Sequence, residues 1–144
     1  MRRVDIKHLF SEPGRNWTAK TGATEAEISA LIVSARVKLP VEYLDLLRYS
    51  NGGEGPLDLP PLWFALYSSL ECIELFHSDQ HLLTNFPDFL FFGSNGGLET
   101  IGFDLRTAHP WRIVMIDAIA GATSCTQIAT DISTFIRKIG IEAT

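Results

Sequence analysis

Histidines that could bind a metal ion lie close together in one segment of the chain. His77 and His81 are four positions apart, so both would lie on one face of a helix, and Asp79 between them could supply an oxygen ligand. A zinc site needs a further protein ligand, and the sequence does not place one. His8 and His109 are isolated. We therefore interpret His77 and His81 as surface histidines and predict no metal site.

Acid–base catalysis by a pair of carboxylates is a second chemistry that the sequence could support. The candidate residues are Glu99, Asp104 and Asp117. A working pair needs one carboxyl group with a raised pKa in a pocket, and sequence spacing does not supply that environment. Asp104 and Asp117 stand at the ends of expected strands, where an aspartate commonly accepts hydrogen bonds from turn amides. We therefore predict structural roles for both.

A glycine-rich segment, Gly-Ser-Asn-Gly-Gly at residues 93–97, suggests a phosphate-binding loop. It lacks the spacing of such a loop, the Lys-Ser/Thr pair and any nearby basic residue, so Gly93, Gly96 and Gly97 are better interpreted as a turn between two strands. Cys72 and Cys125 lack a local signature of a nucleophile, and we expect both to be reduced structural thiols. We predict no catalytic residue, no cofactor and a protein that is not an enzyme.

Charge is distributed unevenly along the chain. No Lys or Arg occurs between Tyr49 and Leu105, whereas this segment holds eight carboxylates and so has a net charge of −8. A negative field repels phosphate backbones, which argues against nucleic acid and favours a basic protein partner. The alternative is that the carboxylates only keep the surface soluble. The candidate acidic face for a partner consists of Glu54, Asp58, Glu71, Glu74 and Asp79.

The length of 144 residues is typical of one domain, and no repeat or linker divides it. Residues 1–23 are predicted as a loosely structured N-terminal arm with a short helix around residues 4–10, pinned by Trp17, and residues 24–144 as the domain. No apolar run approaches the roughly 18 residues that span a bilayer, and the first 14 residues lack the apolar part of a secretion signal. We predict a cytoplasmic protein with no membrane partner.

Two helices are expected in the first half of the domain. Thr24 and Glu27 have the spacing of a capping box, and an apolar stripe follows at Ile28, Leu31, Ile32 and Ala35. Pro40 would occupy the first position of the second helix, in which Tyr43, Leu46 and Leu47 face inward. That helix should stop at Asn51, Gly52 and Gly53, because these residues tolerate positive φ.

The second half of the domain changes to short β-branched and aromatic segments. Residues 62–67, 90–92, 100–104, 112–117 and 126–129 are predicted strands. A helix capped by Ser69 is expected between the first two strands. Thr130 and Asp131 should cap a C-terminal helix, with Ile132, Phe135, Ile136 and Ile139 inward. The predicted fold class is α+β, a mainly antiparallel sheet flanked by helices.

A capped helix followed by LPVEYLDLLRYSNGG at residues 39–53 is a distinctive combination. With the later order of strand, glycine turn, Phe103-Asp104, a strand ending at Asp117 and a closing helix, it resembles the SUKH superfamily over residues 24–140. That group includes the fungal Smi/Knr cell-wall assembly regulators and many bacterial toxin-immunity proteins. The matching positions have scaffold roles, and they are Leu39, Pro40, Tyr43, Leu46, Asn51, Gly52, Gly53, Gly93, Gly96, Gly97, Asp104 and Asp117.

The resemblance implies a small α+β domain whose bacterial members neutralise polymorphic toxins, many of them nucleases, by direct binding, and it brings no catalytic residues. We therefore expect an immunity protein that binds a basic toxin domain. The alternative is a regulatory scaffold that binds a cellular protein in cell-wall assembly or signalling. A hydrolase or metal enzyme that uses His77, His81, Asp104 or Asp117 is a third hypothesis. The partner, the binding surface and the oligomeric state stay open at this point.

Overall fold

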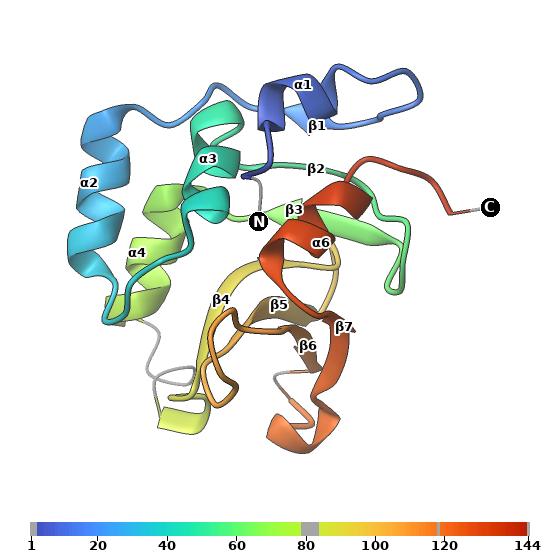
Figure 1. Cartoon of the computed structure of the whole chain (residues 1–144). Coiled ribbons are helices and arrows are strands. Elements are labelled where there is room, and N and C mark those ends of the chain that lie inside the picture. The colour runs from blue at the N-terminus through green and yellow to red at the C-terminus, as the bar shows by residue number, and fades with distance from the viewer. Residues whose placement is uncertain (1–2, 79–83, 118, 144) are drawn as a thin grey trace.

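The fold is built on one seven-stranded sheet, seen in the computed structural model, which describes residues 3–78, 84–117 and 119–143. The strands lie in the sheet in the same order as in the chain, and every pair of neighbours is antiparallel. The sheet is therefore a meander (Figure 1). The strands are β1 (Thr18–Ala19), β2 (Gly53–Pro56), β3 (Trp63–Leu66), β4 (Phe89–Ser94), β5 (Glu99–Asp104), β6 (Ile113–Asp117) and β7 (Thr126–Ala129).

Helices occupy the N-terminal half, the connection between β3 and β4, and the C-terminus. In Figure 1, α2, α3 and α4 lie together on one side, and α6 crosses in front of the sheet. The predicted α+β class with a mainly antiparallel sheet is confirmed. The helices are α1 (Ile6–Phe10), α2 (Glu25–Ser34), α3 (Val41–Tyr49), α4 (Ser69–Ser78), the short 3-10 helix η1 (Ala122–Ser124) and α6 (Ile132–Lys138). Within the described residues, no helix is long and apolar enough to cross a membrane.

The helix starts follow from local hydrogen bonds, with two corrections to the sequence prediction. Thr24 and Glu27 form the predicted capping box. Pro40 is the N-cap of α3 and not its first residue, because its ψ of 138° is extended. Ser69 does not cap α4. The preceding Ser68 does so by accepting the Glu71 amide, while the Glu71 carboxylate accepts the Ser68 amide.

The inner face of the sheet packs against the helices in one continuous core. Leu31 of α2, Tyr43 of α3, Cys72 of α4 and Phe135 of α6 are all fully buried there, together with Phe92 of β4. The predicted inward residues of α3 and the C-terminal helix are also buried. Ile32 of the predicted α2 stripe is an exception: it is exposed, and the buried residues of α2 are Ile28 and Leu31.

The outer face of the sheet carries a smaller, separate cluster. Strand β4 is buried on both sides because Leu90 and Phe92 point to the inner core, while Phe89 and Phe91 point outward. The rings of Phe89 and Phe91 stack at 6.2 Å, and Phe86 packs edge-on against both. No residue of a helix belongs to this cluster among the described residues.

The N-terminal segment packs more closely than the loose arm that we predicted. Phe10 of α1 is buried in the inner core, and β1 pairs with β2 through Thr18 opposite Glu54. Trp17 links the segment to the rest of the domain: its indole lies 6.0 Å from the Phe64 ring, and its Nε1 donates to Ser50 Oγ at 3.1 Å. A two-residue edge strand has too few residues to produce an alternating sequence pattern, so it could not be predicted.

Candidate functional site

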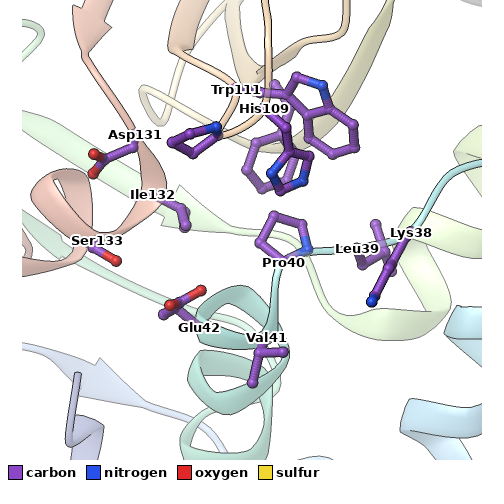
Figure 2. A pocket seen from close by; sticks show the side chains of 12 residues that line it. Lys38, Leu39, Pro40, Val41, Glu42, His109, Trp111, Asp131, Ile132 and Ser133 are labelled. Atoms are coloured by element: carbon purple, nitrogen blue, oxygen red, sulfur yellow. The ribbon is translucent and has the colours of Figure 1, made fainter. Parts of the chain in front are cut away.

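An apolar groove lies where α3, the loop between β5 and β6, and α6 meet. Its volume is about 540 Å³. Figure 2 shows Pro40 facing His109 across the groove, with Ile132 on the side of α6. Phe103 of β5 also lines it. Cavities of this size with apolar walls are typical of sites that accept a ligand or a partner's side chain.

Local interactions hold each wall of the groove in place. The Thr107 hydroxyl donates to the carbonyl of Asp104 at 2.8 Å, which fixes the loop that carries His109 and Trp111. The Trp111 ring packs 5.7 Å from Phe103 and 4.6 Å from His109. These tilted rings form an aromatic wall that is continuous with the inner core.

Charged groups stand only at the margins of the groove. Figure 2 shows Glu42 and Asp131 on the side nearer α6, and Lys38 on the opposite side. The Asp131 carboxylate is already engaged, because it accepts the Thr134 amide at 2.8 Å as the N-cap of α6. An apolar floor with polar margins suits an anchoring side chain of another molecule, and it offers no paired acid and base.

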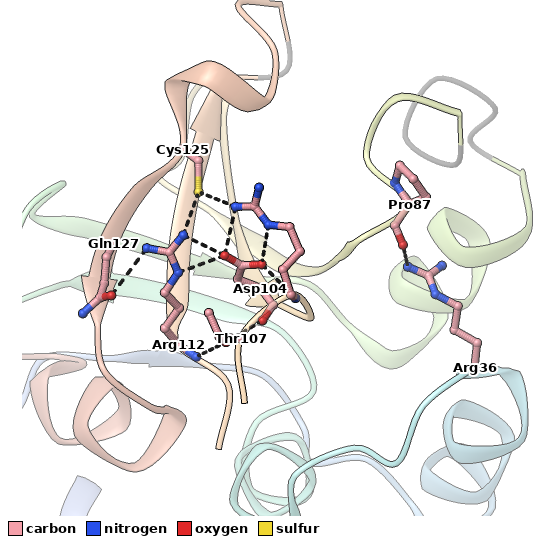
Figure 3. A network of polar contacts seen from close by, with 8 residues as sticks. Arg36, Pro87, Asp104, Thr107, Arg112, Cys125 and Gln127 are labelled. Carbon is pink, nitrogen blue, oxygen red and sulfur yellow. Dashed lines mark hydrogen bonds and ion pairs between the residues drawn. The ribbon is translucent and has the colours of Figure 1, made fainter. Parts of the chain in front are cut away.

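A buried carboxylate, Asp104, holds two arginines on the outer face of the sheet (Figure 3). Arg106 donates to both of its oxygens at 2.9 and 3.0 Å, and Arg112 donates through Nε at 2.9 Å. The Arg106 guanidinium also lies over the Phe89 ring, 4.7 Å from its centre. The Cys125 sulfur lies 3.9 and 3.8 Å from the two arginines.

The pKa of Asp104 reflects two opposing influences. Burial alone would raise it, but the hydrogen bonds from Arg106 and Arg112 outweigh that effect and lower the pKa from 3.8 to about 2. The Asp104 carboxylate is therefore ionised at neutral pH, and it holds Arg106 over the Phe89 ring of the outer cluster. A carboxylate held in this way does not act as a general base near neutral pH.

The two cysteines are free thiols in different surroundings. Burial raises the pKa of the Cys72 thiol to about 12, and the Tyr43 hydroxyl lies 3.3 Å from its sulfur. Burial likewise raises the pKa of Tyr43 well above its ordinary value. Both groups are neutral at physiological pH and form a polar contact inside the inner core. Cys125 is half-buried beside the arginines.

The five acidic residues of the predicted partner-binding face are not all brought together. Glu54 is exposed on β2, and Asp58 follows that strand, where its amide donates to the carbonyl of Lys138. Glu71 and Glu74 are exposed on α4, which Figure 1 shows on the opposite side of the molecule from the end of α6. Asp79 lies outside the described residues. The acidic residues thus border two different regions.

The described residues considered for catalysis or metal binding do not form a catalytic or metal site, although Glu99 and Asp117 are cross-strand neighbours. His77 is exposed on α4, and His81 lies outside the described residues. Asp117 Oδ1 accepts the amides of Ile119 and Ala120 at the end of β6, and Glu99 stands opposite Asp117 at the strand ends. Among the described residues, no group of three histidine, cysteine or carboxylate side chains could hold a metal ion.

The residues of the sequence motif all lie in structural positions. Leu39 and Pro40 line the groove, and Tyr43 is buried on the inner side of α3. Asn51 Oδ1 accepts the Ser69 amide at 2.7 Å and so joins the end of α3 to the start of α4. The glycines that need positive φ are Gly52 at 111°, Gly53 at 105° and Gly96 at 81°. Gly93 and Gly97 complete the segment around the β4–β5 turn.

Sequence reasoning missed the groove and both partners of Asp104. His109 and Trp111 lie within five residues of Arg106 and Arg112 in the chain, in a loop that the sequence indicated only as a reversal. Two arginines eight residues or fewer from a strand-end aspartate were the available signal. A groove, in contrast, depends on three segments from distant parts of the chain.

The fold and the groove define an α+β domain with a meander sheet and a concave apolar surface. A family model described as SMI1 / KNR4 family (SUKH-1) matches residues 22–138, and the chain belongs to this family. The family is generally non-catalytic and includes immunity proteins. No curated protein matches the sequence.

Proposed function

We propose that this chain is a non-enzymatic protein-binding domain, an immunity protein that binds and neutralises a bacterial toxin in the cytoplasm. Family membership over residues 22–138 is the observation that carries the proposal. The chemistry of the described residues supports it. Each strongly shifted pKa belongs to a structural contact: Asp104 to its arginines, and Tyr43 and Cys72 to each other.

The charge of the chain favours a basic partner, as a toxin nuclease would be. The segment from Tyr49 to Leu105 has no Lys or Arg, and Glu54, Glu71 and Glu74 within it are exposed. A negative field accelerates encounter with a positive surface and loses strength as salt is added. Affinity, in contrast, depends on a few desolvated anchors. The groove between Pro40 and Trp111 provides a place for such an anchor.

Co-expression with a toxin whose gene neighbours that of this chain tests the proposal directly. We expect the chain to relieve the toxin's lethality and to form a stoichiometric complex with its isolated toxic domain. Lethality that persists although the chain is expressed and folded would contradict the proposal for that pair.

Charge reversal tests the contribution of the acidic residues. Glu71→Lys with Glu74→Lys should slow association with the toxin domain by about tenfold at low salt and make it less salt-sensitive. Glu142→Lys, which changes an exposed carboxylate outside the acidic segment, is the matched control. Equal association rates for all three proteins would show that the α4 carboxylates do not steer the toxin domain.

A regulatory scaffold is the second candidate function, and the SMI1 / KNR4 description of the family favours it. Such a scaffold would bind a cellular protein in cell-wall assembly or signalling. It predicts reproducible endogenous partners for the purified chain and no protection against the neighbouring toxin. A single stoichiometric toxin partner would contradict it.

A further inference from the structure

Three large apolar side chains are exposed at the start of β3 and in the neighbouring turn between β4 and β5. Trp63 of β3 is 39% exposed, the preceding Leu62 is 53% exposed, and Leu98 in the turn between β4 and β5 is 77% exposed. Gly96 of that turn approaches the Trp63 indole so closely that a Cβ there would lie 2.9 Å from the ring. We call Leu62, Trp63 and Leu98 the Trp63 patch.

Strand alternation places Trp63 on the outer face of the sheet. Phe64 is fully buried in the inner core, and neighbouring residues of a strand point to opposite faces. Glu54 is paired with Ala65, so it shares the face of Trp63, and its Oε1 accepts the Trp63 Nε1 hydrogen at 3.2 Å. The indole and the carboxylate are therefore held together at the surface.

The half of the outer face that carries the patch lacks the covering found on the other half. At β4 to β6, the rings of Phe86, Phe89 and Phe91 close over Val114 and Ile116. At β1, β2 and β3, the exposed groups include Thr18, Glu54 and Trp63. The backbone beside the patch is also unusual, because Leu62 has a φ of 75°, which a bulky side chain rarely adopts. Backbone strain of this kind is found most often at binding and catalytic sites.

The charged residues of β2, β3 and the loop between them are all acidic. Glu54 is bonded to Trp63, and Asp58 lies in the loop that is closed by the Leu57 amide bonding to the carbonyl of Leu62. Neither β2, β3 nor the turn with Leu98 contains a Lys or Arg. Lys20, next to the end of β1, is the cation of the adjoining strand. Arg106 and Arg112, farther along the same face, both pair with Asp104, so that group keeps one net positive charge.

We propose that the Trp63 patch is a second docking surface, separate from the groove, for a protein segment that presents Lys or Arg beside an apolar side chain. The apolar side chain packs on Trp63 and Leu98, and the cation pairs with Glu54 and stacks on the indole face. The proposal rests on the proposed function only in taking the partner to be a protein. It names the side of the molecule that meets the basic part of that partner.

The test uses the three tryptophans of the full chain as reporters. In ¹⁵N-labelled protein each indole N–H gives its own signal: Trp63 reports the patch, Trp111 the groove and Trp17 the N-terminal segment. The probe is a synthetic hexapeptide that alternates leucine with arginine. A peptide with glutamate in place of arginine is its control.

We expect the arginine peptide to shift the Trp63 indole signal and the amides of Glu54 and Leu98, with a weaker effect in high salt. Leu98→Ser and Glu54→Gln should each weaken this binding by about tenfold. Val33→Ser, on α2, removes a side chain that is 85% exposed away from the patch and should leave binding unchanged. All three substitutions lie on the surface and should leave the fold intact. Unchanged signals from the rest of each variant verify this.

Several results would overturn the proposal. They are a Trp63 signal that does not move, an equal response to the glutamate peptide, and shifts confined to Trp111. A dimer that forms with rising concentration and disappears in Leu98→Ser would assign the patch to a second copy of the chain. Neutralisation of the toxin with an unmoved Trp63 signal would contradict this inference alone. Failed neutralisation with a shifted Trp63 signal would contradict only the proposed function.

Discussion

The two faces of the sheet are covered from solvent in different ways. On the inner face, helices α2, α3, α4 and α6 cover the strands and form one core. On the outer face no helix residue joins the cluster within the described part of the chain, and phenylalanines from β4 and the segment before it cover only the strands β4 to β6. The remaining strands expose Trp63 beside Glu54. When helices cover one face of a sheet, apolar residues on the other face are either buried by other segments, replaced by polar residues, or left exposed as a binding surface.

The closure of the outer cluster depends on a few polar contacts at its margin. Asp104 holds Arg106 across the Phe89 ring. Arg36, just after α2, donates to the carbonyl of Pro87, as Figure 3 shows, and also to that of Phe89. These bonds hold the loops in contact with the apolar side chains of the outer cluster. The outer cluster is therefore smaller, and its stability is more sensitive to charge than that of the inner core.

The largest losses in the free energy of unfolding should appear when one phenylalanine ring is removed from either face of the sheet. Phe92→Ala should lower the free energy of unfolding by about 4 kcal/mol, because Phe92 is fully buried among Tyr43, Phe64, Phe103 and Phe135. Phe91→Ala should cost about 3 kcal/mol, since its surroundings can collapse into the cavity. Denaturant unfolding measures both. An equal or larger loss for Phe91→Ala would show that the outer cluster packs as rigidly as the inner core.

Removal of the Asp104 charge should have the next largest effect. Asp104→Asn leaves two guanidiniums without their carboxylate, and the loss should be about 2 kcal/mol because Arg106 and Arg112 are 46% and 29% exposed. Asp45→Asn is a matched control, since Asp45 also lies between two arginines, Arg3 and Arg48, at the surface. It should cost less than about 1 kcal/mol. A similar loss for both variants would contradict the special role of Asp104.

Acid should remove the same stabilisation gradually. The folded-state pKa of Asp104 is lowered to about 2 from 3.8, so its contribution is complete above pH 4 or so and is lost as the pH falls toward 2. The contribution amounts to at most about 2 kcal/mol. Unfolding curves of the wild-type chain and Asp104→Asn should therefore converge between these pH values. Curves that stay parallel would assign the acid sensitivity to other groups.

The smallest effect is expected on the open half of the outer face. Leu98→Ser should change the free energy of unfolding by less than about 0.5 kcal/mol, because the side chain is 77% exposed. Thermal or denaturant unfolding provides the measurement. A loss above 1 kcal/mol or so would mean that Leu98 helps to cover Trp63 in the folded chain, and that the patch is part of the fold.

Much of the inner face could be predicted from local sequence patterns. The capping box at Thr24, the buried side of α3 and the cap at Asp131 depend on residues within one or two helical turns, so their spacing in the sequence is their spacing in space. Strand β7 was also predicted with its observed bounds, because its residue types are a local feature of the sequence. The segment 39–53 also indicated the family before the fold was known.

The sequence by itself thus determined the helices, most strands, the turn glycines and the family. Tertiary structure alone decided what depends on contacts between distant segments. It paired the short strands β1 and β2, joined Pro40, Trp111 and Ile132 into a groove, and separated Glu54 from the carboxylates of α4. It also determined that Trp63 is open while Phe91 is covered. Both are aromatic residues in strands, and the difference arises because only the segment before β4 folds back over its neighbours on that face.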